Sequence, residues 1–300
     1  MAEPSIDRGT GEGMKSLRTA LRLLMQFGGD QRDLGVGELA ERCGLSKSQV
    51  SKVLAAFAET GLLLQNAETR RYSVGPRMFA LGSRFVTHDP LCREAMPVMR
   101  DIVERTGHSA RLSVLDGDDV LYLVGAEGPL FVATGWRAGT WLPVPSTATG
   151  RVLLAFMSPE RAERALSHAP LRPVTERTVT DPVQLRRLVE SARSRGYCTQ
   201  RGETTPGLGV TAVPIFGAGQ QVVGALSLAF PAHLVTARDE AELAESLHDS
   251  ARVLSQRIGG TVYPFGHRRG VEPAPAPGPA RRSRDTAAAA STATARGAHR

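Results

Sequence analysis

The sequence predicts an α+β protein with two unlike halves, and two observations carry that prediction. From residue 14 to about residue 90, apolar residues recur at helical spacing, interrupted by one short hairpin. From about residue 109 onward, short apolar runs bounded by turn signals predict antiparallel strands, with helical segments grouped between them. We therefore expect a helical module with a two-stranded ribbon, followed by a larger domain built on an antiparallel sheet.

The N-terminal half contains two short helices, Gly37–Cys43 and one that begins after Ser46, joined by a tight turn at Gly44. Ser46 and Gln49 have the spacing of a capping box, and Gly61 follows the second helix as a C-terminal glycine does. The apolar residues of the second helix recur at i, i+3, i+4 and i+7 and form one buried stripe: Val50, Val53, Leu54 and Phe57. Its exposed end and face carry polar side chains of the kind that a recognition helix uses to reach base edges and phosphates: Ser46, Lys47, Ser48, Gln49, Ser51 and Lys52.

Two short strands, Leu62–Gln65 and Arg70–Val74, are predicted around a polar turn. Arg70 and Arg71 fall at the tip of this ribbon, where the wing of a winged helix-turn-helix meets phosphate or the minor groove. An ordinary pair of amphipathic helices with a solvated charged face would explain the helices alone. The cap, the glycine turn, the basic hairpin and the excess of positive charge together favour DNA binding.

Two more helices flank this module. The first is predicted from Ser16, its cap, to Phe27, and it would complete a three-helix core. Pro76 predicts the start of another helix, which runs to about residues 89–90 and links the two domains. We expect the apolar side of this linker, which includes Leu81 and Phe85, to contact a second copy of the chain. Packing of that side on the chain's own DNA module is the alternative.

Composition excludes several classes of protein and places the charge unevenly. The chain has no run of 18 apolar residues, which excludes a membrane span, and its first residues lack the apolar core of a signal peptide. Its three cysteines are far apart and share no metal-ligand spacing with the seven histidines, so we expect a cytoplasmic protein with reduced thiols. Residues 14–88 hold eleven Lys and Arg against six acids, whereas residues 89–260 hold eighteen against nineteen. This asymmetry fits nucleic acid at one end and another ligand in the centre.

The larger domain is predicted to mix helices and strands, and both ends of the chain are predicted to lack a stable fold. The expected helices are Arg93–Thr106, Gly150–Phe156, Pro159–His168, Val183–Arg195 and Arg238–Ile258. The expected strands are Ala110–Leu115, Val120–Val124, Leu130–Thr134, Gly209–Ile215 and Val222–Phe230. The predicted segments are a disordered start at 1–13, the DNA-binding module at 14–75, the linker helix at 76–90, the larger domain at 91–260 and a disordered tail rich in Ala, Pro and Arg at 261–300.

One segment of the larger domain has the character of a ligand site. Thr147–Gly150 opens a predicted helix, where free backbone N–H groups favour an anion such as a carboxylate. The simpler alternative is that Thr147 caps the helix and Gly150 only packs. Cys198 lies in a second informative region, but no sequence feature places a histidine base beside it. No nucleophile elbow, phosphate-binding loop or metal motif is present in the sequence.

Three separated motifs resemble those of the IclR family of bacterial transcriptional regulators. The first joins Leu39-Ala40, Gly44-Leu45 and Lys47-Ser48-Gln49-Val50, and it continues into the ribbon end Tyr72-Ser73-Val74-Gly75-Pro76. The second is the stretch from Thr147 to Phe156. The third contains Arg195-Gly196-Tyr197, Glu203, Gly207-Leu208-Gly209-Val210 and Ala212-Val213-Pro214-Ile215. Together they cover roughly residues 14–259, and their order makes the resemblance specific.

This resemblance implies a winged-helix domain, a linker helix and a GAF-like effector-binding domain, assembled as homodimers or homotetramers and without catalysis or a cofactor. It places effector-binding positions on the second and third motifs and on the last strands: Ala148, Thr149, Gly150, Gln200, Val210, Ser227 and Ala229. Relatives that bind small acids tend to have Asp, Cys and Ser where this chain has Gln200, Val210 and Ala229. We therefore expect a medium-sized, partly apolar or aromatic acid, covered by Leu130, Phe131, Trp141 and Leu142.

The leading hypothesis is a sequence-specific DNA-binding transcriptional regulator controlled by a small-molecule effector, an organic acid. Its expected partners are a double-stranded DNA operator, the effector and a second copy of the chain, with no membrane involved. The alternative is a ligand-binding or assembly protein whose winged helix mediates protein contacts. An enzyme on the central domain is the weakest reading, because no catalytic constellation is found.

Overall fold

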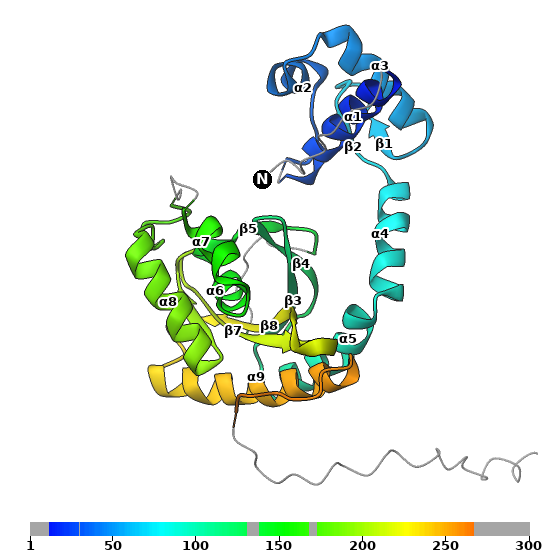
Figure 1. Ribbon diagram of the computed structural model, residues 1–300. Helices are drawn as coiled ribbons and strands as arrows, with labels where there is room; N and C mark the ends of the chain where they lie inside the picture. Colours follow the sequence, from blue (N-terminus) through cyan, green and yellow to red (C-terminus); the bar gives the residue numbers. More distant parts are fainter. Residues whose placement is uncertain (1–11, 30, 131–137, 168–172, 267–300) are drawn as a thin grey trace, which may run out of the picture. The chain divides into compact units, whose positions relative to one another are not determined.

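The structure is a computed structural model that describes residues 12–29, 31–130, 138–167 and 173–266 (Figure 1). The expected disorder of residues 1–11 and 267–300 and most of the expected strand Leu130–Thr134, with Phe131, lie outside these ranges. Within the described residues, helices come first, a two-stranded ribbon follows, and a mixed domain with a six-stranded sheet completes the chain. The predicted α+β class is confirmed.

The N-terminal module contains three helices and the ribbon: α1 (Glu12–Met25), η1 (Gln26–Gly28), α2 (Val36–Cys43), α3 (Lys47–Glu59), β1 (Leu63–Gln65) and β2 (Tyr72–Val74). Gly44 turns the chain between α2 and α3 with φ +63°, a left-handed conformation that favours glycine. The helix α1 begins at Glu12, so the prediction that Ser16 caps it is wrong, because Ser16 lies inside the helix. One apolar core joins the helices to the ribbon: Leu23, Phe27, Leu34, Leu39, Ala40, Val50, Leu54, Leu63 and Tyr72.

The linker helix α4 (Pro76–His88) starts at the predicted proline, and Gly75 occupies its N-cap position. The next helix, α5 (Pro90–Thr106), begins two residues later, where the Asp89 carboxylate accepts a hydrogen bond from the backbone N–H of Cys92. Gly107 ends α5 in the left-handed conformation, as the sequence predicts. No residue of α4 is buried within a single copy of the chain.

Six antiparallel strands form the sheet of the larger domain in the order β5-β4-β3-β8-β7-β6. Their bounds are β3 (Ser109–Asp116), β4 (Asp119–Ala126), β5 (Trp141–Pro143), β6 (Cys198–Arg201), β7 (Leu208–Phe216) and β8 (Val222–Pro231). The long strands match the sequence predictions. The two edge strands, β5 and β6, were not predicted, because runs of three and four residues are too short to show a repeat.

Helices cover both faces of this sheet (Figure 1). One face packs on α5 and α9 (Ala237–Arg257), and the core between them includes Met99, Ile102, Leu112, Leu228 and Leu247. The other face packs on α6 (Ala148–Ala155), α7 (Pro159–Ser167) and α8 (Pro182–Arg195), which contribute Val152, Leu153, Leu166 and Leu185. Every residue of strand β7, which lies between β8 and the edge strand β6, is buried, since helices cover it on both sides. Short 3-10 turns, η2 (Val144–Ser146) and η3 (Ala218–Gln220), complete the elements.

Residues 261–266, which the sequence assigned to the tail, pack against this domain. The Tyr263 hydroxyl lies 3.0 Å from Nδ1 of His248 and donates to the Pro214 carbonyl oxygen, and the Phe265 carbonyl oxygen accepts from Arg252. The Phe265 ring stacks on His248 at 5.7 Å. This short segment therefore belongs with the folded domain. Among the described residues, no helix combines the length and the apolar content that crossing a membrane requires.

Candidate DNA-binding face and effector pocket

The start of α3 is fixed by the predicted capping box. The Gln49 backbone N–H donates to the Ser46 hydroxyl oxygen at 3.3 Å, and the Gln49 amide oxygen accepts from the Ser46 N–H at 3.2 Å. The side-chain oxygen of Gln49 therefore serves the cap in this structure. All predicted positions of this helix lie on the surface: Ser46, Lys47, Ser48, Gln49, Ser51 and Lys52.

The two arginines of the ribbon have different environments. Arg70 is exposed and holds the turn with φ +57°, and its backbone N–H donates to the Asn66 carbonyl oxygen. Arg71 donates to the carboxylates of Asp33 and Glu38, the latter at 2.9 Å, and to the Asp33 carbonyl oxygen at 3.1 Å. Arg71 thus ties the ribbon to the start of α2, whereas Arg70 faces solvent.

The Glu38 carboxylate joins this cluster to the helix cap. It accepts a hydrogen bond from the Gly35 backbone N–H at 2.8 Å and a second one from Arg71. These hydrogen bonds, the one from Gly35 foremost, hold the pKa of Glu38 below its usual range. The carboxylate is therefore charged at neutral pH and stabilises the positive end of α2.

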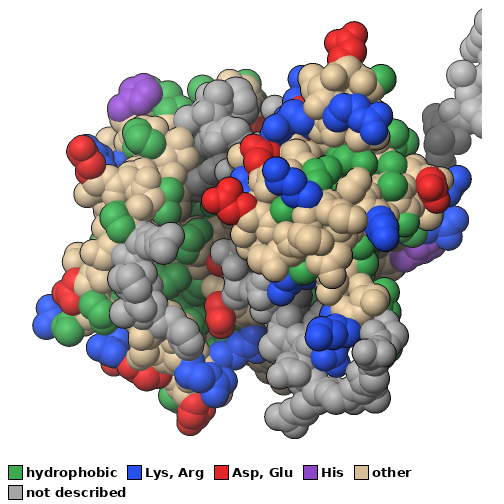
Figure 2. All heavy atoms as spheres, turned by 90° about the horizontal axis from the view of Figure 1, so that it is seen from above, with side chains coloured by type: hydrophobic (Ala, Val, Ile, Leu, Met, Phe, Trp, Pro, Cys, Tyr) green, Lys and Arg blue, Asp and Glu red, His purple; other side chains and the backbone are tan. Residues whose placement is uncertain are grey.

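Positive charge does not form one continuous patch on the face shown in Figure 2. Lys and Arg side chains are interspersed there with Asp and Glu side chains and with apolar ones. On this face, attraction to phosphates is therefore spread over separate points, and a DNA contact there would depend on the placement of individual side chains.

The sheet register brings the predicted effector positions together. Gln200 on β6 lies opposite Val210 on β7, and Val210 lies opposite Ala229 on β8. Two residues before Ala229 on β8, Ser227 lies opposite Ala212 of β7 on one side and opposite Arg111 of β3 on the other. Because side chains alternate between the faces of a strand, these two rows face the same layer of helices. Residues that lie far apart in the sequence therefore share one surface of the sheet.

A narrow pocket with a cavity volume of about 30 Å³, room for about one water molecule, lies over these rows. Five of the predicted positions line it: Ala148, Thr149, Gln200, Val210 and Ser227. Leu142, predicted as an apolar cover, also lines it. Ala229 lies beside the lining in the same apolar cluster as Val210. Gly150 is buried, and a Cβ atom there would overlap the Val144 carbonyl oxygen. Packing alone therefore requires a glycine at this position, whether or not a ligand binds.

The sequence did not single out Arg111, the charged residue in the lining of the pocket. Arg111, only 6% exposed, lines the pocket with its guanidinium carbon 5.4 Å from the centre of the Tyr122 ring. Burial raises the pKa of the Tyr122 hydroxyl, and the charge of Arg111 partly opposes that rise. The remaining lining residues that were missed are Ser113, Val120, Tyr122 and Thr204; Thr147, which opens the predicted anion-binding segment, also lines the pocket. The alternation Arg111-Leu112-Ser113 in an otherwise apolar strand was the signal for this polar face.

The start of α6 combines a cap with the pocket wall. The Thr147 hydroxyl oxygen accepts from the Gly150 N–H at 2.9 Å, so one of the free donors expected at this helix start is already used. Cys198 lies on the same side of the sheet and is buried, and burial raises the pKa of its thiol. A buried protonated thiol is a poor nucleophile. In the described part of the chain, no cluster of His, Cys, Asp and Glu is arranged to hold a metal ion.

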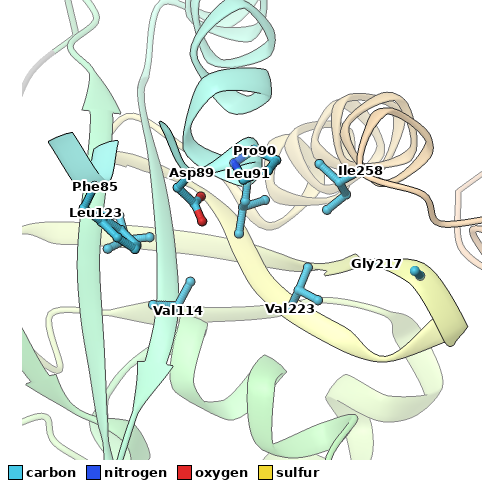
Figure 3. A pocket seen from close by; sticks show the side chains of 10 residues that line it. Phe85, Asp89, Pro90, Leu91, Val114, Leu123, Gly217, Val223 and Ile258 are labelled. Atoms are coloured by element: carbon cyan, nitrogen blue, oxygen red, sulfur yellow. The ribbon is translucent and has the colours of Figure 1, made fainter. Parts of the chain in front are cut away.

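A second hollow lies where the linker helix meets the larger domain (Figure 3). It has a cavity volume of about 330 Å³ and is mostly apolar. Phe85 and Leu91 come from α4 and α5, and Val114, Leu123 and Val223 come from three strands. The linker helix is therefore in contact with the face of the sheet that lies opposite the effector pocket.

Comparison with known domain families matches both halves of the chain. Residues 16–67 match the IclR helix-turn-helix domain, and residues 83–256 match the family described as bacterial transcriptional regulator IclR C-terminal. The second match alone covers more than half of the chain. The two matches correspond to the ribbon-bearing helical module and to the domain that contains the pocket.

Individual relatives agree with this assignment. The HTH-type transcriptional regulator KdgR of Escherichia coli is 31% identical over 242 residues, which are 81% of this chain and 92% of that protein. The crystal structure of an IclR transcriptional regulator from Alicyclobacillus acidocaldarius is similar with a TM-score of 0.73 and 28% identity, covering 82% of this chain and 99% of that one.

A third relative carries a ligand. An IclR homologue from Microbacterium hydrocarbonoxydans, solved in complex with 4-hydroxybenzoate, has a TM-score of 0.68 and 27% identity and covers 81% of this chain and 98% of its own. The chain belongs to the IclR family of bacterial transcriptional regulators, with an N-terminal helix-turn-helix that binds DNA and a C-terminal domain that binds an effector.

Proposed function

We propose that this regulator recognises a specific operator and that a medium-sized, partly apolar organic acid sets its affinity for that operator. The observation that carries the proposal is the pocket in which Arg111 and Tyr122 lie among Val120, Leu142 and Val210. A buried guanidinium beside apolar walls suits a carboxylate attached to an apolar or aromatic body. The 4-hydroxybenzoate complex of a relative supports this class of ligand.

Calorimetry against a panel of acids tests the ligand class. We expect 4-hydroxybenzoate or a similar aromatic acid to bind, and neutral 4-hydroxybenzyl alcohol to bind at least tenfold more weakly, because a charge-assisted hydrogen bond contributes about 1.5–3 kcal/mol. Arg111→Met should remove the preference for the acid over the alcohol, whereas Arg187→Met on the exposed face of α8 should leave it unchanged. Tight binding of glyoxylate or pyruvate, with no response to any larger acid, would contradict the proposal.

The pocket wall offers a second test of the same ligand class. Val210→Asp places a carboxylate on the wall formed by Val210, where it competes for Arg111 and repels an acidic ligand. We expect this variant to lose acid binding while Val210→Ile retains it. Operator binding without acid should be the same for both variants.

For the operator, we infer that the exposed start of α3 reads bases. Ser48→Ala is the clean probe, because the Gln49 side chain also holds the helix cap and Gln49→Ala would disturb both functions. A good base contact contributes about 1–3 kcal/mol of discrimination, so selection from random DNA with the variant should yield an altered consensus at one position. An unchanged consensus for Ser48→Ala would contradict the role of α3.

We also propose that two copies associate through the linker helix. Phe79, Leu81 and Phe85 on α4 are 78%, 61% and 53% exposed in a single copy, which is unusual for large apolar side chains on one helix. Helix-turn-helix regulators commonly bind paired half-sites as dimers. Phe79→Ser should shift the mass measured by light scattering toward the monomer, and a wild-type protein that is already monomeric would exclude this interface.

A further inference from the structure

A buried ion pair lies behind the effector pocket. Arg151 of α6 is 0% exposed, and its guanidinium makes two parallel hydrogen bonds to the carboxylate of Glu203, with Nη1 to Oε1 at 2.8 Å. Its Nε donates to the Pro145 carbonyl oxygen at 2.8 Å. The Glu203 side chain is 10% exposed. The pair therefore fixes the loop after β6 to the helix that opens the pocket.

Glu203 also fixes the orientation of a pocket side chain. Its backbone N–H donates to the amide oxygen of Gln200 at 2.8 Å. The amide nitrogen of Gln200 then points the other way and donates to the Thr204 hydroxyl at 3.1 Å. Gln200 and Thr204 both line the pocket, so the polar groups that they present to a ligand depend on where Glu203 lies.

The same glutamate holds the segment that connects α7 to α8. The Val179 N–H donates to the Glu203 carboxylate at 3.2 Å, and the Thr178 hydroxyl donates to the Glu203 carbonyl oxygen at 2.6 Å. The neighbouring Thr175 hydroxyl donates to the Gly202 carbonyl oxygen at 2.7 Å. The connector thus depends on two consecutive residues of the loop.

An apolar pair of similar volume would fill this space without the cost of burying two charges. What an apolar pair lacks is direction, because a bidentate guanidinium–carboxylate contact fixes both the distance and the angle between its partners. The ion pair therefore holds the loop, and with it Gln200 and Thr204, in one geometry.

We propose that Arg151 and Glu203 are positioning residues of the effector pocket, which orient Gln200 and Thr204 without touching the ligand. The inference rests on the proposed function only for the identity of the ligand. The orientation of Gln200 does not depend on that function, because it can be measured without a ligand.

The double variant Arg151→Met/Glu203→Leu tests the proposal, since it replaces both charges by apolar groups and leaves neither partner buried alone. We expect it to melt cooperatively and to bind operator as the wild type does. Its dissociation constant for 4-hydroxybenzoate should rise about tenfold, the loss of one or two well-placed hydrogen bonds. The matched control is Arg186→Met/Glu163→Leu, which removes an exposed ion pair of the same composition on α7 and α8 and should leave that constant unchanged.

The second readout is a crystal structure of the double variant without ligand. We expect Gln200 to lose at least one of its two hydrogen bonds, to the Glu203-position N–H or to Thr204. A Gln200 that keeps both bonds overturns the inference, and so does an unchanged dissociation constant with a displaced Gln200. If the double variant does not fold, Arg151→Lys, which keeps the buried charge pair and removes the two parallel hydrogen bonds, gives the same two readouts.

If the proposed function is wrong, the measurements on the wild-type protein differ from those described above. In that case the wild-type protein binds no acid of the panel, although its Gln200 is oriented as in the present structure. The crystal structure of the variant then decides the positioning role alone.

Discussion

Two arginine–carboxylate clusters, one in each half of the molecule, use the same chemistry in opposite surroundings. In the DNA-binding module, Arg71 joins Asp33 and Glu38 with about a third of its side chain exposed. In the effector domain, Arg151 joins Glu203 with no exposure at all. Both arginines connect segments that are far apart in the sequence, the ribbon to α2 in one case and a loop to α6 in the other.

The difference in burial decides what each cluster can do. Water and salt screen the exposed cluster of Arg71, Asp33 and Glu38, which we call the outer cluster. Its ion pairs therefore allow the ribbon to shift at little cost in free energy, and they weaken as the salt concentration rises. The Arg151 cluster, the inner one, is buried, so solvent does not replace a lost partner and the pair is costly to break on one side. A binding face that must adapt to DNA and a pocket that must hold a small ligand are thus built from the same groups.

The largest effect is expected from breaking the inner cluster on one side. Arg151→Met leaves the Glu203 carboxylate buried with no cation, which should cost about 3–5 kcal/mol of unfolding free energy in urea denaturation. Arg186→Met removes the exposed partner of Glu163 and should not change the midpoint measurably. Equal losses in both variants would show that burial does not distinguish the two kinds of pair.

A buried histidine in the effector domain sharpens the comparison. His248 is 3% exposed, and its pKa is lowered to about 4, mainly by burial; Glu245 and Asp249 oppose this shift and Arg252 adds to it. Its Nδ1 lies 3.0 Å from the Tyr263 hydroxyl. The unfolded chain takes up the proton near pH 6.5, so unfolding free energy should fall as pH drops from about 6.5 to about 4 and be independent of this residue above that range.

Urea denaturation of the wild type and of His248→Gln measures this contribution. The wild type should lose roughly 2–3 kcal/mol more than the variant between pH 7 and pH 4.5, because each unit of pKa shift corresponds to about 1.4 kcal/mol. Carboxylates titrate in both proteins and cancel in the difference. Parallel pH profiles would show that the imidazole is not held neutral.

The two halves also differ in how far the sequence predicted them. The N-terminal module follows from local signals, since the capping box, Gly44 and Pro76 each act on their nearest neighbours. The pocket does not, because Arg111 and Tyr122 meet Gln200 only through the register of a sheet whose strands lie about ninety residues apart. The resemblance to a family supplied Gln200, Val210 and Ser227 but not the charged partner.

Arg71 shows the same limit inside the well-predicted half. Its position at the ribbon suggested a phosphate contact, and nothing local pointed to Asp33, which lies thirty-eight residues earlier in the chain. Local patterns therefore predicted the elements and their order. Contacts between distant charged side chains required the structure.

A smaller effect should follow from loosening the outer cluster. Asp33→Asn removes a negative charge from the DNA-binding module, which by attraction to phosphates alone would tighten operator binding. We expect it to weaken binding about two- to fivefold instead, because Arg71 loses a partner that holds the ribbon against α2. Glu59→Gln at the exposed end of α3 is the charge-matched control and should bind slightly more tightly than the wild type. Tighter binding of both variants would remove the positioning role of Arg71.

The smallest effect concerns Arg70, the arginine that the outer cluster leaves facing solvent. If Arg70 meets phosphate, Arg70→Ala should weaken binding to operator and to random DNA by the same factor and reduce the slope of log affinity against log salt by about 1. Ser48→Ala should do the reverse, changing the preferred sequence while keeping the slope. Fluorescence anisotropy with both DNAs across a salt series measures the two quantities together. An unchanged slope in Arg70→Ala would favour a ribbon that contacts protein and not DNA, because a phosphate contact cannot be removed without changing the number of counterions released.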